Sequence, residues 1–355
     1  MSPRPPRISD RPIVKAPRIL GIDPSTVGPL LSLVAQIERH TLSGDGVDIN
    51  MTETVKISRS AALILTAQLE RSLTRSKGCL NGFSPIDMTA CRRLHAFGFY
   101  KHLGFSTPPS ILSDPMDDIT VISGINVTPD LSSRLEMIAD IATPIFGSSE
   151  FVEHIHEALS EAMANIMGHA YIKGVESVPL FAQTMLNVLN TGSLESLEVQ
   201  ARSAALERWW IAGHVDRASG ELLLYALDHG HSIPIIAPFR MEDALEEFWS
   251  AYPEKRPLSK PRTTDAQLLE AVARARREGY GTGRRGRGFP SMIGLVEKEA
   301  TSGAVTVLSG AALYEFNMLT HDAPATERTY PLNRRFPGTL IEWRIGGARV
   351  AGDLA

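Results

Sequence analysis

The prediction of this chain's fold starts from one polar pattern, in Glu157-Ala-Leu-Ser-Glu161-Ala-Met-Ala-Asn165-Ile-Met-Gly-His169-Ala-Tyr171. Three of its polar residues, Glu161, Asn165 and His169, follow one another at intervals of four. Four residues advance about 400° around an α-helix, so these side chains form a nearly straight row on one face. A carboxylate and an amide in such a row suit a metal-bound phosphate and an oriented water molecule. The stretch therefore predicts a helix that forms one wall of a polar site.

Taken alone, this row has simpler explanations. Glu161 and Asn165 are also what a solvated helix face contains, and His169 is better explained as a packing or hydrogen-bonding residue near the helix end. The same helix carries an apolar stripe that predicts a core on its other side. The stripe consists of Val152, Leu159, Met163 and Ile166.

Composition predicts two ordinary domains in a soluble, cytoplasmic protein. The chain has 355 residues, of which 43% are hydrophobic and 21% charged, enough for two separate cores. Its net charge of −4 does not favour a polyanion-binding protein as a whole. The two cysteines, Cys79 and Cys91, lack the spacing of metal ligands, and no apolar run approaches the roughly 20 residues of a membrane span.

The first half of the chain has the pattern of a small α/β domain over residues 19–110. Residues 46–50 predict a strand, and the periodicity from Ser60 and from Met88 predicts two amphipathic helices. Ser58 or Ser60 is the expected cap of the first helix. Residues 1–18 are basic and rich in proline, which predicts a poorly ordered tail, and residues 111–129 are expected to be a linker.

The second half, residues 130–348, has the pattern of a larger α/β domain. Arg217-Ala-Ser-Gly220 separates two strand-like runs and predicts an antiparallel hairpin. An insertion at about 239–285 contains two helical patches, 241–252 and 264–278, and we expect it to form a large, mobile lid. Three further strand-like runs follow, and residues 349–355 are expected to be a short tail.

Two glycine-bearing boxes follow this helix in the sequence. They are Asp228-His-Gly230-His-Ser-Ile-Pro234 and Gly281-Thr-Gly-Arg-Arg-Gly286-Arg-Gly288-Phe-Pro-Ser-Met292. With the helix and the pair Gly338-Thr339, this order resembles the GHKL superfamily of ATP-binding domains over residues 130–348. The resemblance implies a Bergerat-type α/β sandwich, in which a mixed sheet has helices on one face.

The resemblance also implies a role for each matching residue. Glu161 falls at the general base, Asn165 at the amide ligand of Mg²⁺, and Asp228 at the acceptor of the adenine amino group. Gly230 falls in the turn beside the base, where a side chain would collide with the nucleotide, and Thr339 completes the adenine contact. Asp228 alone could equally be a turn residue.

The second glycine box corresponds to the family's phosphate-binding loop. Gly286 and Gly288 match the glycines whose backbone amides approach the phosphates. Arg285 and Arg287, with Arg284, place positive charge in the same box, where binding a triphosphate is a simpler use than binding nucleic acid. His231 departs from the pattern, because it stands where the second glycine of the Asp-x-Gly-x-Gly turn is usual.

The first domain resembles a STAS domain, the fold of anti-sigma-factor antagonists, over about ninety residues. In that family a serine at the start of the helix after the central strand accepts phosphate from a GHKL serine kinase. Ser60 falls nearest that place, with Ser58 beside it, although the surrounding Ser58-Arg-Ser-Ala differs from the family's Asp-Ser-Ser-Gly. An ordinary helix cap explains either serine as well.

These resemblances predict an ATPase or protein serine kinase that uses ATP and Mg²⁺ as a nucleotide-dependent switch. Its expected partners are ATP and a regulatory protein, with homodimerisation as a family-level expectation and no membrane. Two alternatives stay open. One is an interaction module gated by ATP that does not hydrolyse it, and the other is a nucleic-acid-directed effector that uses the basic tail and the lid arginines.

Overall fold

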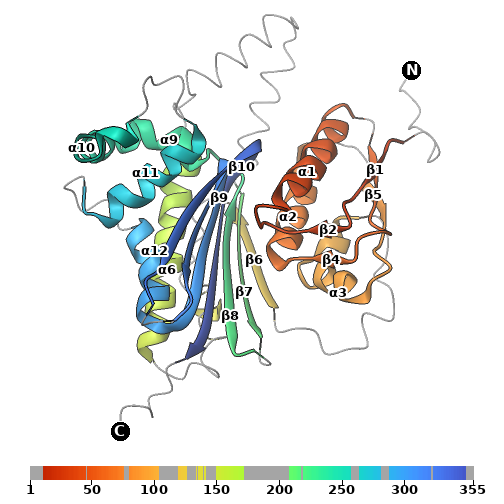
Figure 1. Cartoon of the computed structure of the whole chain (residues 1–355). Helices are drawn as coiled ribbons and strands as arrows, with labels where there is room; N and C mark the ends of the chain where they lie inside the picture. The colour runs from red at the N-terminus through yellow and green to blue at the C-terminus, as the bar shows by residue number, and fades with distance from the viewer. Residues whose placement is uncertain are drawn as a thin grey trace, which may run out of the picture. The chain divides into compact units, whose positions relative to one another are not determined.

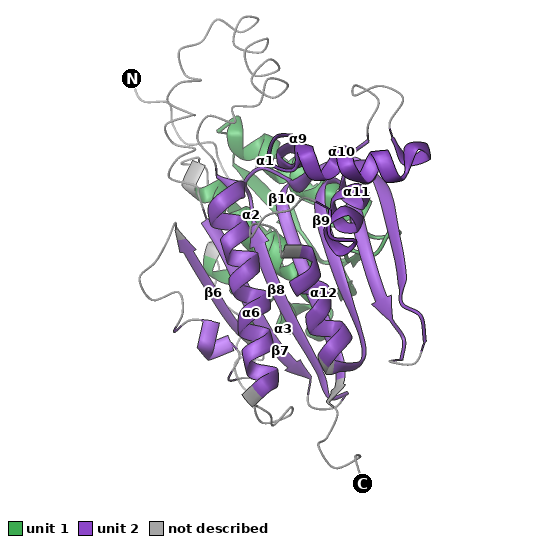
Figure 2. Cartoon of the chain, turned by 90° about the vertical axis from the view of Figure 1, so that its left-hand side faces the viewer, with its two compact units in different colours: residues 1–119, 195–206 green, residues 120–194, 207–355 purple. Residues whose placement is uncertain are grey.

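The computed structural model is of the mixed α/β class, as predicted, and its chain divides into two compact units. It describes residues 11–44, 46–75, 80–103, 119–125, 133, 135–138, 140, 149–171, 208–216, 219–256, 264–280, 288–320 and 323–348. One unit comprises residues 1–119 with 195–206, and the other residues 120–194 with 207–355 (Figure 2). Among the described helices, none is both long and apolar enough to cross a membrane.

The first unit is built from parallel strands joined by helices (Figure 1). Strand β3 pairs in parallel with both β1 and β5, while β2 and β4 form a separate parallel pair. Parallel neighbours need a crossover connection, which α1 and α2 supply. The elements are β1 (Ile13–Lys15), β2 (Ile19–Leu20), α1 (Val27–Leu42), β3 (Val47–Asn50), β4 (Lys56–Ile57), α2 (Arg59–Arg75), β5 (Leu80–Phe83), α3 (Met88–Ala96) and the 3-10 helix η2 (Phe99–His102).

This unit begins earlier than the sequence indicated. Strand β1 lies inside the predicted tail, and Ile13 pairs with Asp48 of β3. The Asp48 carboxylate also lies 3.9 Å from the Arg11 guanidinium, and Thr54 Oγ1 donates to the Pro17 carbonyl at 2.9 Å. The prediction of a poorly ordered tail was therefore wrong for residues 11–18, because basic and proline-rich composition does not report strand pairing with a distant segment. Residues 1–10 lie outside the described part.

The second unit contains a five-stranded sheet in the order β6-β7-β8-β10-β9. The β7–β8, β8–β10 and β10–β9 pairs are antiparallel, and the β7–β8 hairpin turns at Gly220, as predicted. Strand β6 (Ile119–Ile125) lies within the expected linker 111–129 and belongs to this sheet. The other strands are β7 (Arg208–Asp216), β8 (Glu221–Asp228), β9 (Ala300–Met318) and β10 (Thr326–Ala348).

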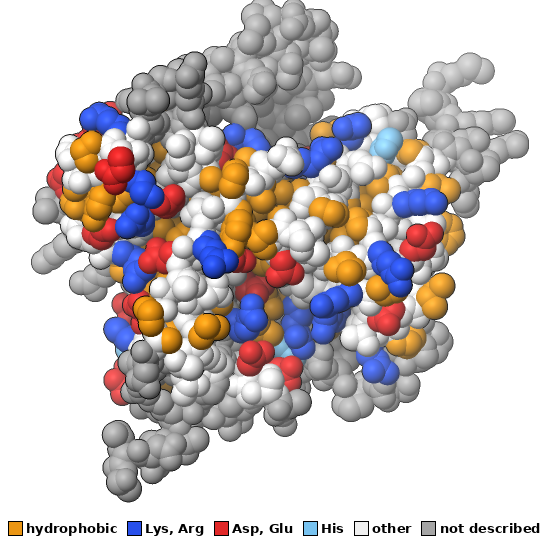
Figure 3. Space-filling view, in the orientation of Figure 1, with side chains coloured by type: hydrophobic (Ala, Val, Ile, Leu, Met, Phe, Trp, Pro, Cys, Tyr) orange, Lys and Arg blue, Asp and Glu red, His pale blue; other side chains and the backbone are white. Residues whose placement is uncertain are grey.

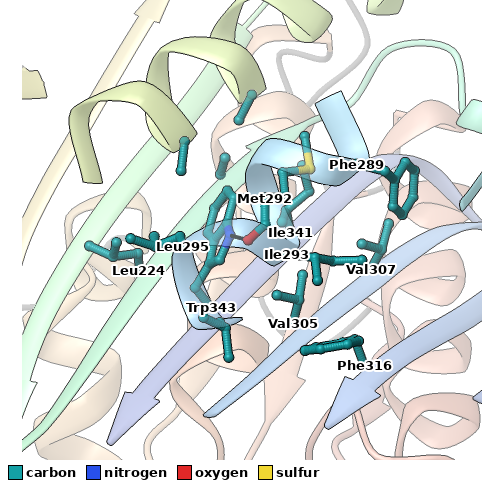
Figure 4. Packing of buried hydrophobic residues seen from close by; sticks show 14 of the residues in the cluster. Leu224, Phe289, Met292, Ile293, Leu295, Val305, Val307, Phe316, Ile341 and Trp343 are labelled. Atoms are coloured by element: carbon teal, nitrogen blue, oxygen red, sulfur yellow. Dashed lines mark hydrogen bonds between the residues drawn. The ribbon is translucent and has the colours of Figure 1, made fainter. Parts of the chain in front are cut away.

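Helices cover one face of this sheet (Figures 1 and 2). The predicted helix is α6 (Ser149–Asn165), which continues as the π-helix η3 (Ile166–Ala170). Beside it lies α12 (Gly288–Glu299), whose Met292 and Ile293 pack over β9 and β10 (Figure 4). Trp343 Nε1 donates to the Met292 carbonyl at 3.0 Å, so this buried indole is hydrogen-bonded.

The insertion forms a group of helices at one end of the helical layer (Figure 2). They are α9 (Ile233–Arg240), α10 (Glu242–Ala251), the 3-10 helix η4 (Pro253–Lys255) and α11 (Asp265–Arg277). The two predicted helical patches are thus confirmed as α10 and α11. Thr264 caps α11 in a capping box with Gln267, because the Thr264 hydroxyl accepts from the Gln267 amide and the Gln267 side chain accepts from the Thr264 amide.

Helix α11 is anchored at both ends, which differs from the expected mobile lid. At its start, the Asp265 carboxylate accepts from the Ala311 amide at 2.6 Å and lies 2.9 Å from the Arg335 guanidinium. At its end, Arg277 pairs with Glu297 and Glu327. Both sets of contacts connect α11 to other elements of its own unit, so this part of the insertion is a fixed wall.

Candidate functional site

A pocket of about 470 Å³ opens between α6, the insertion, α12, the end of β8 and the middle of β10. This volume lies within the range of small-molecule sites. Four of the predicted site residues, Glu161, Asn165, Asp228 and Thr339, line it, although they come from three separate segments of the sequence. The lining residues are Glu161, Ala162, Ala164, Asn165, Ile166, His169, Ala170, Asp228, His231, Ile233, Ile236, Ala237, Arg240, Met241, Val272, Arg276, Phe289, Met292, Thr339 and Ile341.

The polar row of α6 forms one wall of this pocket. Glu161 and Asn165 are half-buried in it, and His169 also lines it from a more exposed position. The backbone changes from α to π at Ile166, directly after Asn165. Single π turns inside helices occur frequently at functional sites. The predicted row is confirmed in that all three side chains border the same cavity.

Asp228 is a buried carboxylate at the end of β8 that lines the pocket. Its Oδ1 accepts a hydrogen bond from the Gly230 amide at 2.8 Å, and the Thr339 amide also donates to it. Burial raises the pKa of Asp228 to about 7, and the two backbone hydrogen bonds act in the opposite direction. The side chain is therefore a desolvated hydrogen-bonding group whose charge changes near neutral pH.

The turn after Asp228 packs against the end of the π-helix. A Cβ atom built on Gly230 would lie 2.2 Å from the Ala170 carbonyl oxygen, and the His231 amide donates to that oxygen at 2.7 Å. Gly230 is therefore needed for contact with protein backbone, a reason for glycine that holds without any nucleotide, and the predicted clash with nucleotide stays a prediction. His231 itself lines the pocket, half-buried, and burial lowers the pKa of its imidazole.

Thr339 reaches the pocket from β10, where it pairs with Asp228 of β8. Its Oγ1 lies 2.9 Å from Ser309 Oγ, which also accepts from the Ile233 amide at 2.9 Å. The preceding Gly338 has φ of +108°, and a Cβ there would lie 2.1 Å from the Asp228 carbonyl oxygen. A side chain is thus excluded at Gly338 both by backbone conformation and by the close approach of β8.

The predicted phosphate-binding box is described only at its end. Gly286, Arg285 and Arg287 lie outside the described residues. Gly288 is the first residue of α12, and Phe289 and Met292 of that helix line the pocket. The box therefore leads into a helix that lines the pocket, whereas the position of its glycines and arginines relative to the pocket stays a prediction.

Ser60, the predicted phosphoacceptor, is 1% exposed in the first unit. Its Oγ lies 3.0 Å from Ser58 Oγ, and Ser58 Oγ accepts from the Ala61 amide at 3.1 Å. Ser58 is thus the cap of α2, and Ser60 is a buried residue of the first turn. This burial is unfavourable for an acceptor hydroxyl, which has to reach the phosphate of a second molecule.

Two basic residues of the pocket were not singled out from the sequence. Arg240, at the end of α9, and Arg276, near the end of α11, both line it. Their only sequence signal was helical spacing from apolar neighbours, because Arg240 follows Ile233, Ile236 and Ala237 on one face of α9.

The pocket residues fit a Mg²⁺ ion that is coordinated mainly by the phosphates of a bound substrate and by water. Among the described residues, no group of three or more histidine, cysteine or acidic side chains could form a metal site by itself. Mg²⁺ commonly binds through one or two protein oxygens together with substrate phosphates and water. The Asn165 amide, with no hydrogen bond to any described residue, offers one such oxygen at the pocket wall.

No model of a known protein family matches this chain, and no curated protein sequence matches it either.

Proposed function

We propose that the second unit binds Mg-ATP in this pocket and acts as a GHKL-type ATPase or protein kinase. In this proposal the first unit is a STAS-like regulatory domain, and the nucleotide state switches the binding of a protein partner. The observation that carries the proposal is the convergence of Glu161, Asn165, Asp228 and Thr339 on one cavity. Their order and spacing along the sequence predict the same shared site.

Each polar group has a role that its environment supports. Asp228, at the end of β8, pairs with Thr339 of β10, and its carboxylate and the Thr339 hydroxyl would receive the adenine amino group. The pocket also has apolar walls, including Ile233, Met292 and Ile341, against which a purine ring can pack. In such a site, the buried acceptor selects the nucleobase by hydrogen bonds to its edge, and the apolar walls pack against the faces of its ring.

Glu161 and Asn165 would serve the phosphate end of the ligand. Asn165 would supply an oxygen to Mg²⁺, which when bound neutralises phosphate charge and orients the triphosphate. Glu161 lies one helical turn away on the same wall, where its carboxylate can orient a water molecule or an acceptor hydroxyl. This spacing supports attack on the γ-phosphate by a group that Glu161 positions.

Incubation of the pure protein with γ-labelled ATP and Mg²⁺ tests the proposal. Release of labelled phosphate would identify an ATPase, and label on protein would identify a kinase. Calorimetry with ATP, ADP and GTP should show adenine-selective binding that the Asp228→Asn variant loses. Wild-type protein that binds no nucleotide at millimolar concentration would contradict the proposal.

The nucleic-acid alternative has less support from the described surface. On the face shown in Figure 3, Lys and Arg side chains of the described residues are interspersed with Asp and Glu. Nucleic-acid binding usually needs a patch or stripe of positive charge. Binding of DNA or RNA that falls with salt but survives saturating ATP would favour this alternative.

A further inference from the structure

The end of α11 carries three arginines whose surroundings differ. Arg274 lies 3.7 Å from both Glu270 and Glu278, and its guanidinium is over the Tyr252 ring at 5.4 Å. Arg277 pairs with Glu297 and Glu327 and lies over the ring of Phe316 at 5.3 Å. Both of these guanidinium groups have acidic and aromatic partners within the protein.

Arg276 faces the pocket instead. Successive helical residues are about 100° apart, so Arg276 points about 200° away from Arg274. It shares a face with Val272, four residues earlier, and both line the pocket. No acidic side chain of the described residues lies within ion-pair distance of its guanidinium. Arg276 is thus the one arginine of this helix end whose charge has no counterpart among the described residues.

The environment of Arg276 makes the lack of an acidic partner among the described residues energetically unfavourable. Its side chain is half-buried, and desolvation lowers the pKa of the guanidinium. A partly desolvated cation is unfavourable unless an anion or several acceptors compensate it. Guanidinium groups bind phosphate oxygens with two parallel hydrogen bonds, which makes a phosphate a suitable compensating group.

Arg240 adds a second positive charge to the same cavity. It ends the face of α9 that lines the pocket, and within the described residues it too makes no ion pair. Helix α11, which carries Arg276, is anchored at Asp265 and Arg277, so the Arg276 backbone is held in place before a ligand binds. A pre-positioned cation loses less conformational freedom on binding than one on a mobile loop.

We propose that Arg276, assisted by Arg240, binds the phosphate chain of the ligand, so that the insertion is a fixed phosphate-binding wall and not only a cover. This inference rests on the proposed function for the identity of the ligand as a nucleotide. The chemistry that it requires is a polyphosphate, which a nucleoside triphosphate or an inorganic polyphosphate would supply.

Calorimetry with Mg-ATP, adenosine and inorganic triphosphate tests this inference on full-length protein. We expect Arg276→Gln to weaken Mg-ATP binding about ten- to a hundred-fold, since a charged hydrogen-bonding group is lost. Adenosine binding should stay unchanged. Arg276→Lys should give a smaller loss, because it keeps the charge but not the paired hydrogen bonds. The matched control is Arg274→Gln on the same helix, which should bind all three ligands as wild type does.

Thermal unfolding without ligand separates this role from a structural one. Arg276→Gln should unfold at the same temperature as wild type or higher, because it removes an uncompensated charge, and a lower temperature would indicate a structural role and contradict the inference. Equal Mg-ATP affinity in wild type and Arg276→Gln would also overturn it. If inorganic triphosphate binds in an Arg276-dependent manner while ATP and adenosine do not bind, the inference stands and the proposed function fails. If adenosine and ATP bind equally well to wild type and to Arg276→Gln, the proposed function stands and the inference fails.

Discussion

Asp228 and Thr339 face each other across the β8–β10 pair, and the backbone amide of Thr339 donates a hydrogen bond to the Asp228 carboxylate. The Gly230 amide donates to the same side chain. These contacts hold the carboxylate at the pocket wall while burial raises its pKa. Asp228 therefore belongs both to the β8–β10 strand pairing and to the wall of the pocket.

The raised pKa of Asp228 predicts a pH dependence of stability. Its unfolded value is 3.8 and its folded value about 7, so between them the folded protein binds more protons. The contribution of Asp228 to the free energy of unfolding is therefore fully present below pH 3.8 and is lost as pH rises towards 7, at up to about 1.4 kcal/mol per pH unit. Urea unfolding from pH 4.5 to 7.5 should show this slope in wild type and its loss in Asp228→Asn.

The control for this experiment is Asp243→Asn in the first turn of α10, outside the pocket. Its unfolding free energy should follow wild type across the same pH range. Identical slopes in wild type and Asp228→Asn would show that the buried carboxyl does not titrate in this range.

Replacement of Glu161 by Gln should remove turnover and keep ATP binding. The amide has nearly the same shape as the carboxylate but cannot accept a proton, and loss of a general base typically slows a reaction about 10²- to 10⁴-fold. Phosphate release under saturating Mg-ATP measures the effect. Glu157→Gln, one turn earlier on α6 and exposed, is the matched control and should release phosphate as wild type does. Unchanged turnover in Glu161→Gln would exclude this residue as the base and favour the ATP-gated module.

Substitution of Gly230 by Ala should destabilise the second unit. The new methyl group would lie 2.2 Å from the Ala170 carbonyl, so the turn has to separate from the π-helix and the His231–Ala170 hydrogen bond is strained. We expect a loss of about 1–3 kcal/mol in the free energy of unfolding, as for other overpacked sites. In contrast, Gly294→Ala in α12 meets no atom within 4 Å and should stabilise the helix by about 1 kcal/mol. Equal stability of the two variants in urea would contradict the packing that we describe.

Removal of the Asp265 carboxylate should release the start of α11. Asp265→Ala leaves the Ala311 amide without its acceptor and Arg335 without its ion-pair partner. We expect about 1–3 kcal/mol lower stability of this region, seen as faster amide hydrogen exchange in α11 than in α12. Glu270→Ala removes only surface ion pairs, with Lys255 of η4 and with Arg274 of α11, and should change the exchange rates little. Unchanged protection of α11 in Asp265→Ala would show that the contact does not anchor the helix.

Much of the second unit was predictable because its signals are local. The apolar stripe of α6, the hairpin at Gly220 and the two helical patches of the insertion follow from periodicity and turn residues. Strand β1 was not predicted, since only three residues form it and its pairing with β3 is parallel and distant in sequence. Short strands carry too little periodicity to be separated from a linker.

The residues that share a helix face, and the order of the candidate boxes, could be predicted because both depend only on spacing along the chain. The folded chain was needed to show that Gly230 contacts Ala170, that Ser60 is buried and that Arg276 faces the pocket while Arg274 and Arg277 pair elsewhere. These facts depend on how segments far apart in sequence pack together. Spacing within one segment contains no information about the partner that covers it.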